Sequence, residues 1–464
     1  MIRIHALSML LGCLFFVQAS FGQIKSYDPD RIYSTNALKA DLRFLQGKLK
    51  RTHPALYRYT PKPSMDRFFD SLYHSIDHPM KESDFLSLIT LLNAKIGDGH
   101  TMFLPSQAAT EYNNTRGKFL PFSVAFADGK LYVREPCKLD RNIEWGEEIL
   151  SINGISTATI MRELLSRQIR DGNNMTYPVW ILNHYFSAYY SFVYGQPNRF
   201  SLDLKDANGE LHKEKVMALT KDSINSFLEN RFGTRSVLHY ADIGELLEEK
   251  EEGVTATLTI RSFDSEAFKA LFNEGFKRIC DSIFSRLQLL PIQNLILDLR
   301  DNQGGDFETG RYLLSWLLLK PSRYLLGGKE TRLIQPKSNH FTGKIFVLIN
   351  GGSFSNTAIV SAILEKEQRA VFIGEETGGN RTIISGNPVE EALPETKIRC
   401  FISTNSFRIS ADTNDGHGVL PTHPFHPNIS DIMEGNDTSM TMALKLITDD
   451  QRQIFHPNNV KKAL

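Results

Sequence analysis

The residue with the clearest chemical potential is a serine that follows a glycine pair at the end of an apolar segment. Ser355 lies in GGSFSNTA, residues 351–358, between an expected strand at 344–349 and an expected helix at 356–364. A serine at such a strand-to-helix corner directs its hydroxyl toward the cleft above a sheet. The free N–H groups and partial positive charge of the helix N-terminus favour an alkoxide and an oxyanion there. The pattern predicts a nucleophile, although an ordinary helix N-cap uses the same residue type.

A second glycine pair follows another apolar segment. Gly304 and Gly305 end the run DLRDNQGG at 298–305, after an expected strand at 294–300 and before an expected helix at 307–319. Paired glycines let backbone N–H groups approach a ligand closely, as an oxyanion hole requires. Phosphate binding is a competing interpretation, but no Gly-Lys-Ser/Thr follows. A simple glycine turn at a strand end is a third.

A serine hydroxyl needs a base, and His100 in DGHT, residues 98–101, is a candidate. Histidine is the usual base for a serine because its pKa lies near neutrality. The chain has 13 histidines, so residue type alone does not select this one. Asp415, in NDGHGVLP at 414–421, offers a carboxylate to orient the base. An ordinary turn aspartate beside a solvent-facing His417 explains the same segment.

The cysteines indicate neither a metal centre nor a disulfide scaffold. Of the four cysteines, Cys13 lies in the N-terminal apolar run, and the others are widely spaced at positions 137, 280 and 400. This spacing matches no metal-ligand pattern. We expect neither a metal nor an organic cofactor. Cys280 lies on an apolar helical face and is expected in a core.

Charge and composition exclude some partners. Lys plus Arg and Asp plus Glu each number 53, so the 464-residue chain has a formal net charge of zero. There is no basic run or basic field, and no nucleic acid is expected as a partner. Hydrophobic residues form 41% of the chain, enough for ordinary cores in two or three domains.

Residues 1–22 have the features of a secretory signal peptide. Arg3 precedes an apolar run at 6–17, and small residues precede Gln23. The run is too short to anchor the chain in a bilayer, so we expect an exported, periplasmic or secreted protein with no transmembrane segment after processing. A buried N-terminal helix is one alternative. Lipid attachment at Cys13 is another, poorly matched because apolar residues follow that cysteine.

Three regions that could position these residues differ in pattern. Residues 30–105 carry apolar side chains at helical spacing, and residues 116–218 form short strands with tight turns. Residues 235–450 alternate strands with helices, including a long amphipathic helix expected at 266–288. Such alternation predicts an α/β layer with mostly parallel strands, which need long crossover helices.

Together and in this order, the motifs resemble those of the C-terminal processing (tail-specific) serine peptidases. The resemblance is nearest to the branch related to tricorn and interphotoreceptor retinoid-binding protein. It covers nearly the whole chain after the signal and is carried by residues 98–101, 146–154, 297–305, 352–358, 374–379 and 415–421.

The resemblance implies a crotonase-like (ClpP/crotonase-type) α/β catalytic domain at 235–450. It also implies a PDZ-like module at 116–218, which adds a peptide to an open sheet edge. Ser355 would attack the scissile carbonyl, with His100 as the base and Asp415 as its support. The N–H groups of Gly304 and Asn356 would hold the oxyanion. The partners implied are peptides or proteins cut at C-terminal or unfolded segments.

Three positions depart from the family pattern. Many relatives use a lysine base, and Asn380 stands at that position. Gly99 replaces a serine next to the base, and Ala358 replaces a glutamate after the nucleophile. These departures keep two alternatives open, a non-catalytic peptide-binding relative and a serine esterase. Neither the natural substrate nor the oligomeric state follows from the sequence.

Overall fold

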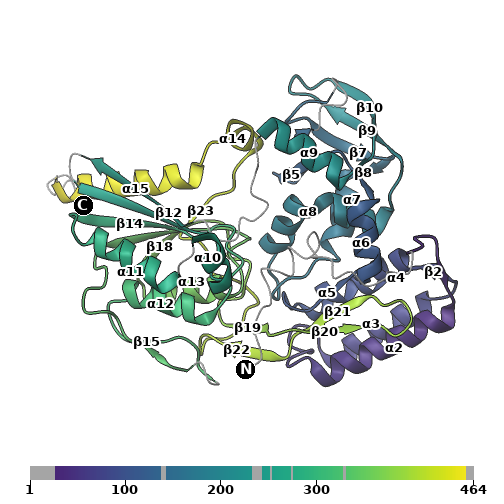
Figure 1. The fold of residues 1–464 in the computed structure, drawn as a ribbon, viewed down its shortest axis with the longest axis horizontal. Coiled ribbons are helices and arrows are strands. Elements are labelled where there is room, and N and C mark those ends of the chain that lie inside the picture. The colour runs from purple at the N-terminus through teal and green to yellow at the C-terminus, as the bar shows by residue number, and fades with distance from the viewer. Residues whose placement is uncertain are drawn as a thin grey trace, which may run out of the picture.

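The computed structural model describes residues 27–136, 143–232, 243–250, 253–272, 275–327 and 331–455. The expected signal peptide and Cys137 lie outside these residues. Within them the chain forms a mixed α/β fold. It has a helical N-terminal part, a first six-stranded sheet with its own helices, and a second, largely parallel six-stranded sheet (Figure 1).

The second sheet has the strand order β12-β13-β14-β17-β18-β23. β12 pairs antiparallel with β13, and every later pair is parallel. Its elements, with their connecting helices, are β12 (Ile243–Lys250), β13 (Gly253–Ile260), α10 (Ser265–Phe272), α11 (Phe276–Leu287), β14 (Ile292–Asp298), α12 (Phe307–Leu317), β17 (Lys344–Ile349), α13 (Asn356–Lys366), β18 (Ala370–Gly374), β23 (His423–Pro424) and α15 (Thr438–Phe455).

Helices cover both faces of this sheet. Leu295 and Leu297 of β14 belong to the core formed with α11, α12 and α13. The residue between them, Ile296, packs with Ala443 and Ile447 of α15 on the opposite face. Figure 1 shows α15 on one side of the sheet and the other three helices on the other side. Because side chains alternate along a strand, a stretch that is buried on both faces must be apolar at successive positions, as residues 295–297 of β14 are.

The expected long helix at 266–288 is wrong, because two helices occupy this segment. α10 ends at Phe272, and α11 begins after Gly275, which has extended backbone (φ −81°, ψ 147°). Glycine has a low helix propensity and is accepted at an N-cap. The apolar spacing on either side of Gly275 nevertheless continues, which is why the sequence predicts one helix.

The N-terminal part is helical because leucines recur on one face of its first long helix. Leu38, Leu42, Leu45 and Leu49 are all buried in a core shared with the later helices. The elements are β1 (Ile32–Tyr33), α2 (Thr35–Thr52), α3 (Lys62–Ser75), β2 (Met80–Lys81), α4 (Glu82–Ile89), α5 (Leu91–Ile96), β3 (Met102–Leu104) and α6 (Gln107–Thr115).

The first six-stranded sheet has the order β10-β9-β7-β6-β5, with β8 paired to β7, so that β5 is an edge strand. A separate two-stranded pair joins β4 to β11. The elements of this region are β4 (Lys118–Phe119), β5 (Phe122–Ala127), β6 (Lys130–Pro136), β7 (Glu148–Ile152), β8 (Ile155–Ser156), α7 (Thr157–Leu165), α8 (Thr176–Tyr194), β9 (Arg199–Lys205), β10 (Leu211–Met217), β11 (Leu219–Thr220) and α9 (Lys221–Phe232).

Sequence reasoning missed α8, a 19-residue helix. Its sequence is rich in aromatic residues, which favour strands, and both of its faces are apolar, so no helical stripe stands out. Tyr177 and Trp180 in its first half pack with Phe354, the neighbour of Ser355. Phe186 and Tyr190 in its second half belong to the core of the first sheet. The helix therefore joins this sheet to the site.

A long segment after β18 connects the N-terminal part to the domain of the second sheet. Its strands are β19 (Ile383–Gly386), β20 (Val389–Ala392), β21 (Arg399–Ile402) and β22 (Asn405–Arg408). β21 pairs antiparallel with β3, directly after His100. Figure 1 shows β20 and β21 beside the N-terminal helices, far from the large sheet. Two short elements lie elsewhere in the chain, the pair β15 (Ser322–Arg323) with β16 (Leu333–Ile334) and helix α14 (Ile429–Glu434).

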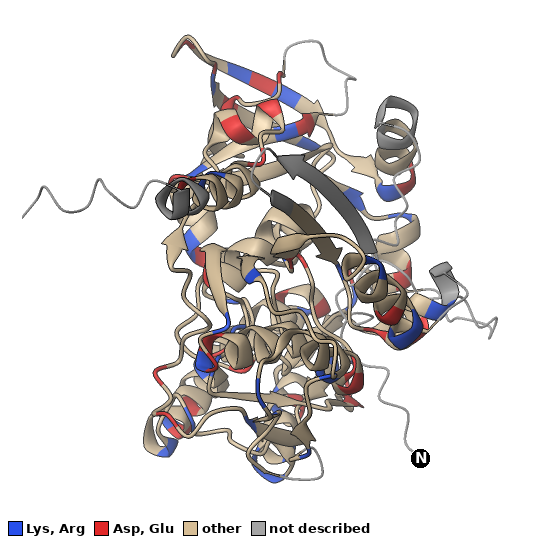
Figure 2. Cartoon of the chain, turned by 90° about the vertical axis from the view of Figure 1, so that its left-hand side faces the viewer, with Lys and Arg blue, Asp and Glu red and all other residues tan. Residues whose placement is uncertain are grey.

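The surface agrees with the balanced composition. Figure 2 shows acidic and basic positions interspersed along the elements on this side, without a field of one sign. Among the described helices, none combines the length and apolar character needed to cross a bilayer.

Candidate active site

Ser355 occupies a strained corner between β17 and α13. Its backbone has φ 55° and ψ −120°, a conformation that L-residues rarely adopt, and it stands at the N-cap of α13 without a side-chain capping bond. Its hydroxyl is therefore not used as the ordinary cap that the sequence left open. Such strain is found where a fold aims a nucleophile into a cleft.

The base candidate lies directly against this serine. His100 Nε2 is 3.1 Å from Ser355 Oγ, although the two residues are 255 positions apart. The ring is 3% exposed and stacks on Phe354, with ring centroids 4.8 Å apart. Burial lowers the pKa of His100 to about 4, although the Asp98 carboxylate acts in the opposite direction. The imidazole is therefore neutral near pH 7 and can accept a proton.

A buried carboxylate holds the segment that carries His100. Asp98 Oδ1 accepts the His100 backbone N–H at 2.7 Å, and Asp98 Oδ2 lies 2.7 Å from His53 Nε2. Since the Ala55 N–H donates to His53 Nδ1, we assign the His53 proton to Nε2, which donates to Asp98. Burial is the largest single influence and would raise the pKa of Asp98, but the hydrogen bonds from His53 and the His100 backbone, together with the charges of the two histidines, outweigh it, lower the pKa and keep the group ionised. Sequence reasoning did not single out either residue.

The glycine pair lies beside the nucleophile. A Cβ at Gly304 would come within 2.8 Å of Ser355 Cβ and 2.7 Å of the Asn356 nitrogen, so only glycine fits there. The Gly304 N–H, expected as an oxyanion donor, donates instead to Asn302 Oδ1 at 2.9 Å. A Cβ at Gly305 would meet the backbone of Phe263 within 2.3 Å. Both glycines are thus required by close approach, and the amides of Gly305 and Asn356 are the other candidate donors.

The structure explains the three departures in physical terms. A Cβ at Gly99 would lie 2.5 Å from Phe354 Cζ, so the ring that supports His100 leaves no room for a serine. Ala358 is fully buried, with no space for a glutamate. Asn380 is also fully buried, and its side chain is bonded to Asn414, Tyr59, Thr382 and Ile383 rather than to Ser355.

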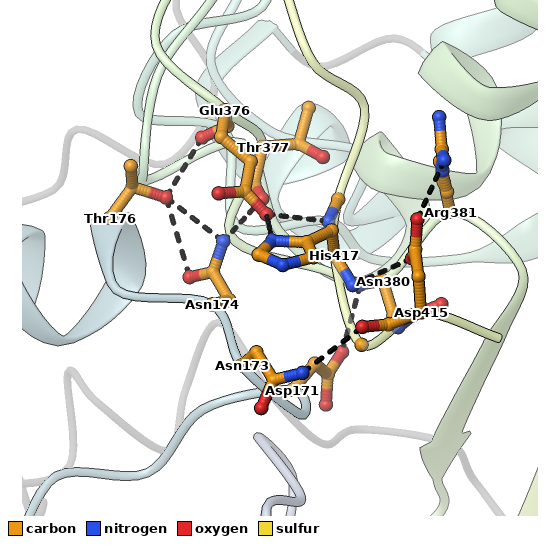
Figure 3. Close-up of polar contacts among 12 residues, drawn as sticks. Asp171, Asn173, Asn174, Thr176, Glu376, Thr377, Asn380, Arg381, Asp415 and His417 are labelled. Atoms are coloured by element: carbon orange, nitrogen blue, oxygen red, sulfur yellow. Dashed lines mark hydrogen bonds and ion pairs between the residues drawn. The ribbon is translucent and has the colours of Figure 1, made fainter.

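The structure does not bring Asp415 to His100. Its Oδ2 is 2.7 Å from Arg381, its Oδ1 accepts the His417 N–H, and its side chain is 41% exposed. Figure 3 shows this carboxylate turned toward Arg381. Among the described residues, the structure shows no contact through which Asp415 could support the base in the predicted way. Its carboxylate instead forms an ion pair with Arg381, two residues before β19.

A different carboxylate lies near the base. Asp171, between α7 and α8, is buried and accepts the backbone N–H groups of Gly99 at 2.8 Å and Asn380 at 3.1 Å. One oxygen each of Asp98 and Asp171 and one ring nitrogen of His100 lie within 4.8 Å of one another. Sequence reasoning missed Asp171 because it stands in a polar loop, RDGNN, with no neighbouring motif.

These three side chains are also a geometrically possible metal site among the described residues. Each of the three side chains already makes other hydrogen bonds. Asp98 accepts bonds from the His100 backbone, His53 and Ser403, and Asp171 accepts two amide N–H groups. His100 Nε2 faces Ser355. We therefore assign the cluster to acid–base chemistry.

A cleft of about 620 Å³ lies beside the side chains of Ser355 and His100. Ser355 and His100 line it together with Gly305. Most of its other walls are apolar, from Phe276, Phe307, Ile384, Pro388 and Phe407. The arrangement places a serine hydroxyl and a neutral imidazole in contact at the wall of a cleft, which are the groups that a serine hydrolase centre requires.

Comparisons with known proteins show similarity to one peptidase family. Residues 255–423 match the model of peptidase family S41. A C-terminal processing peptidase, chloroplastic, from Tetradesmus obliquus is 24% identical over 163 residues, which are 33% of this chain and 35% of that protein. The match thus spans about a third of the curated relative's length.

Solved structures extend the likeness of fold beyond the matched segment. Mature CPAF aligns with 92% of this chain and 99% of its own at a TM-score of 0.65 and 14% identity. CPAF complexed with lactacystin aligns with 90% of this chain and 99% of its own, at a TM-score of 0.66 and 13% identity.

Residues 255–423 are therefore similar to peptidase family S41, and this similarity, with that to the curated processing peptidase, supports a serine-type peptidase. This confirms the resemblance to the tail-specific peptidases drawn from the motifs. The matched segment contains Ser355 and both glycines but neither His100 nor Asp171, which lie in the N-terminal part and before α8.

Proposed function

We propose that the protein is an exported serine endopeptidase that cuts peptide bonds by acyl transfer. The observation that carries this proposal is the 3.1 Å contact between His100 Nε2 and Ser355 Oγ at the wall of an apolar cleft. Ser355 Oγ attacks the scissile carbonyl while Nε2 takes its proton. The proton then passes to the leaving amine as the C–N bond breaks, and water hydrolyses the acyl-enzyme with the same base.

The oxyanion that forms on the carbonyl needs N–H donors. The Asn356 amide at the start of α13 and the amides of Gly304 and Gly305 lie nearest to Ser355 in the chain fold. Because the Gly304 N–H donates to Asn302, its use requires a turn of the 303–304 peptide on substrate binding. We propose Asn356 and Gly305 as donors, with Gly304 joining after that turn.

The large sheet supports assignment of 235–450 to a crotonase-like catalytic domain, and the first sheet supports a PDZ-like module at 116–218. Edge strand β5 and the second half of α8 line a groove of about 500 Å³. Such a groove accepts a peptide as an added strand. Lys221 lines it next to Phe119, and burial lowers the pKa of its ammonium to about 8. We propose that Lys221 attracts the free C-terminal carboxylate of the substrate.

The groove has its own test. We expect Lys221→Gln to weaken binding of a peptide with a free C-terminus about tenfold, since one charged hydrogen bond is lost. Hydrolysis of a small activated ester at Ser355 should not change. An amidated version of the peptide should bind the wild type and the variant equally, and a different result would remove Lys221 from this role.

Export remains part of the proposal, because residues 1–22 lie outside the described residues. Cell fractionation with and without these residues tests it. Accumulation of a shortened chain outside the cytoplasm would support a cleaved signal. Retention of the full-length chain in the cytoplasm would contradict it.

Cleavage is tested with an unfolded protein that has a free C-terminal tail. We expect the wild type to cut it, and Ser355→Ala and His100→Ala to lose cleavage while keeping the circular dichroism of the wild type. Loss with Ser355→Ala alone would keep the peptidase and remove His100 as the base. If folded wild type binds the tail without cutting it, the engaged Gly304 amide marks a peptide-binding relative instead.

A further inference from the structure

The base of the proposed site has one nitrogen without a partner. His100 Nε2 faces Ser355, while Nδ1 is buried and has no hydrogen-bond partner among the described residues. If Nε2 is to accept the serine proton, the neutral ring must carry its proton on Nδ1. A buried N–H without an acceptor is costly, and the ring becomes a cation during the reaction. An acceptor at Nδ1 is therefore part of any working form of this site.

Two carboxylates lie near the His100 ring and are candidates for this role. Asp98 and Asp171 each place an oxygen within 4.8 Å of a His100 ring nitrogen. Since Nδ1 makes no direct hydrogen bond to either carboxylate, one bridging water is the connection that this range allows. Asp98 already accepts three hydrogen bonds, from His53, Ser403 and the His100 backbone, which leaves one lone pair on the oxygen that binds His53. Asp171 accepts one backbone N–H on each oxygen, which leaves a lone pair on each.

Hydrogen bonds to other segments hold Asp171 and its turn in place. Its two amide donors belong to Gly99, next to the base, and to Asn380, at the position of the family's lysine. The residues that follow Asp171 also bind the segment after β18. Asn173 donates to the Asp415 carbonyl, and Asn174 donates to the Thr377 carbonyl. Figure 3 shows these bonds between the turn at 171–174 and the segments around Asn380 and Asp415. The loop that carries Asp415 thus supports the turn that carries Asp171.

We propose that Asp171, and not Asp415, is the positioning residue of this active site, and that it holds the Nδ1–H of His100 through one water molecule. This inference rests on the proposed peptidase mechanism. In this assignment the acid comes from the turn before α8, outside the segment that matches the family. His100 comes from the N-terminal part and Ser355 from the large sheet.

The assignment predicts a distinctive pH dependence. Burial and the nearby Asp98 raise the pKa of Asp171 to about 7, while the two amide donors and Arg58 act in the opposite direction. Tyr59 and Tyr177 also face this carboxyl group, and both stay protonated in the neutral range because burial raises their pKa values. Ionised Asp171 is the stronger acceptor for the bridging water, and only its negative charge stabilises the imidazolium that forms during the reaction. Activity should therefore rise as the pH increases through about 7, although His100 itself is neutral well below that pH.

The test measures how fast a fluorophosphonate labels Ser355 between pH 5 and 9. This readout needs no knowledge of the natural substrate. For the wild type we expect a rise with a midpoint near 7. Asp171→Asn should lower the plateau about 100-fold, less than loss of a directly bonded triad aspartate, and remove the rise. Asp415→Asn should keep both.

The competing assignment gives the opposite result. If Asp415→Asn removes the rise and Asp171→Asn keeps it, Asp415 supports the base and the inference is overturned. A wild type that labels no faster than Ser355→Ala would contradict the peptidase mechanism itself, which separates that failure from the failure of Asp171.

A second measurement applies even if Asp171→Asn does not fold or the serine does not react. In ¹⁵N-histidine wild type, with His100 assigned by comparison with His100→Ala, we expect the Nδ1–H form with a downfield proton above pH 7. The signal should weaken as the pH falls through about 7. A His100 ring in the Nε2–H form, or one whose spectrum does not change through this range, would overturn the role of Asp171.

Discussion

The two halves of the candidate site are built in different ways. The nucleophile half is local, because Ser355 and the glycine pair both follow neighbouring parallel strands, β17 and β14, whose ends lie at one edge of the same sheet. The base half is assembled from distant segments. His100 precedes β3, Asp98 is held by His53, and Asp171 comes from the turn before α8. The nucleophile half therefore needs one well-formed sheet, whereas the base half needs three regions to dock.

This difference predicts how each half responds to substitution. The nucleophile half should lose function through chemistry alone, since its fold does not depend on the hydroxyl. The base half should lose function also through small shifts in packing. The following substitutions separate the two, from the largest expected effect to the smallest.

Ser355→Ala removes the nucleophile and should reduce peptide hydrolysis about 10⁶-fold, as in other serine hydrolases. Stability should hold, because the hydroxyl makes no capping bond and its contact with His100 is a single hydrogen bond. Hydrolysis rate and thermal unfolding measured on the same sample check this. A large drop in unfolding temperature would show that the serine also has a structural role.

His100→Ala should lower the rate about 10²–10⁴-fold, the usual contribution of a general base. The side chain leaves a slot over the Phe354 ring, so added imidazole should restore part of the activity in this variant. The same additive should not help Ser355→Ala, which serves as the control. Equal rescue of both variants would mean that imidazole acts from solution and not from the slot.

Gly99→Ala tests the packing of the base half. The added Cβ would lie 2.5 Å from the Phe354 ring, which is fully buried between His100 and Tyr177. We expect the free energy of unfolding to fall by about 1–3 kcal/mol, as in other overpacked cores, and the rate to fall with it. Gly327→Ala, where a Cβ meets nothing within 4 Å, is the matched control and should behave as the wild type.

Ser403→Ala should have the smallest effect. Ser403 Oγ donates to Asp98 Oδ1 at 3.2 Å and lies 3.2 Å from Thr101 Oγ1, so it links the His100 segment to the end of β21. Losing it should cost about 1 kcal/mol of stability and lower the hydrolysis rate less than tenfold. Ser166→Ala, which removes only the local bonds of its hydroxyl to the Glu163 carbonyl and from Arg167, controls for general loss of a hydroxyl. An unchanged rate in Ser403→Ala would show that this link does not position the base.

Sequence patterns predict the residues of the nucleophile half more completely than those of the base half. Apolar strands followed by glycine turns are local signals, and the structure places Ser355, Gly304 and Gly305 at one edge, as those signals predict. His100 was selected by its order among the motifs and lies 3.1 Å from the serine. Asp415 was selected in the same way, but Arg381 binds its charge.

The sequence by itself determined the class of fold, the serine and the glycine corners, because each depends on residues that are close together in the chain. Only the tertiary structure decided which carboxylates stand beside the base. Asp171 has no local motif, and its place depends on amides from Gly99 and Asn380, which lie 72 and 209 residues away in the sequence. The same holds for α8, whose apolar faces are shared between the first sheet and the site. Contacts between distant segments are set by how whole elements pack, and no short stretch of sequence contains that information.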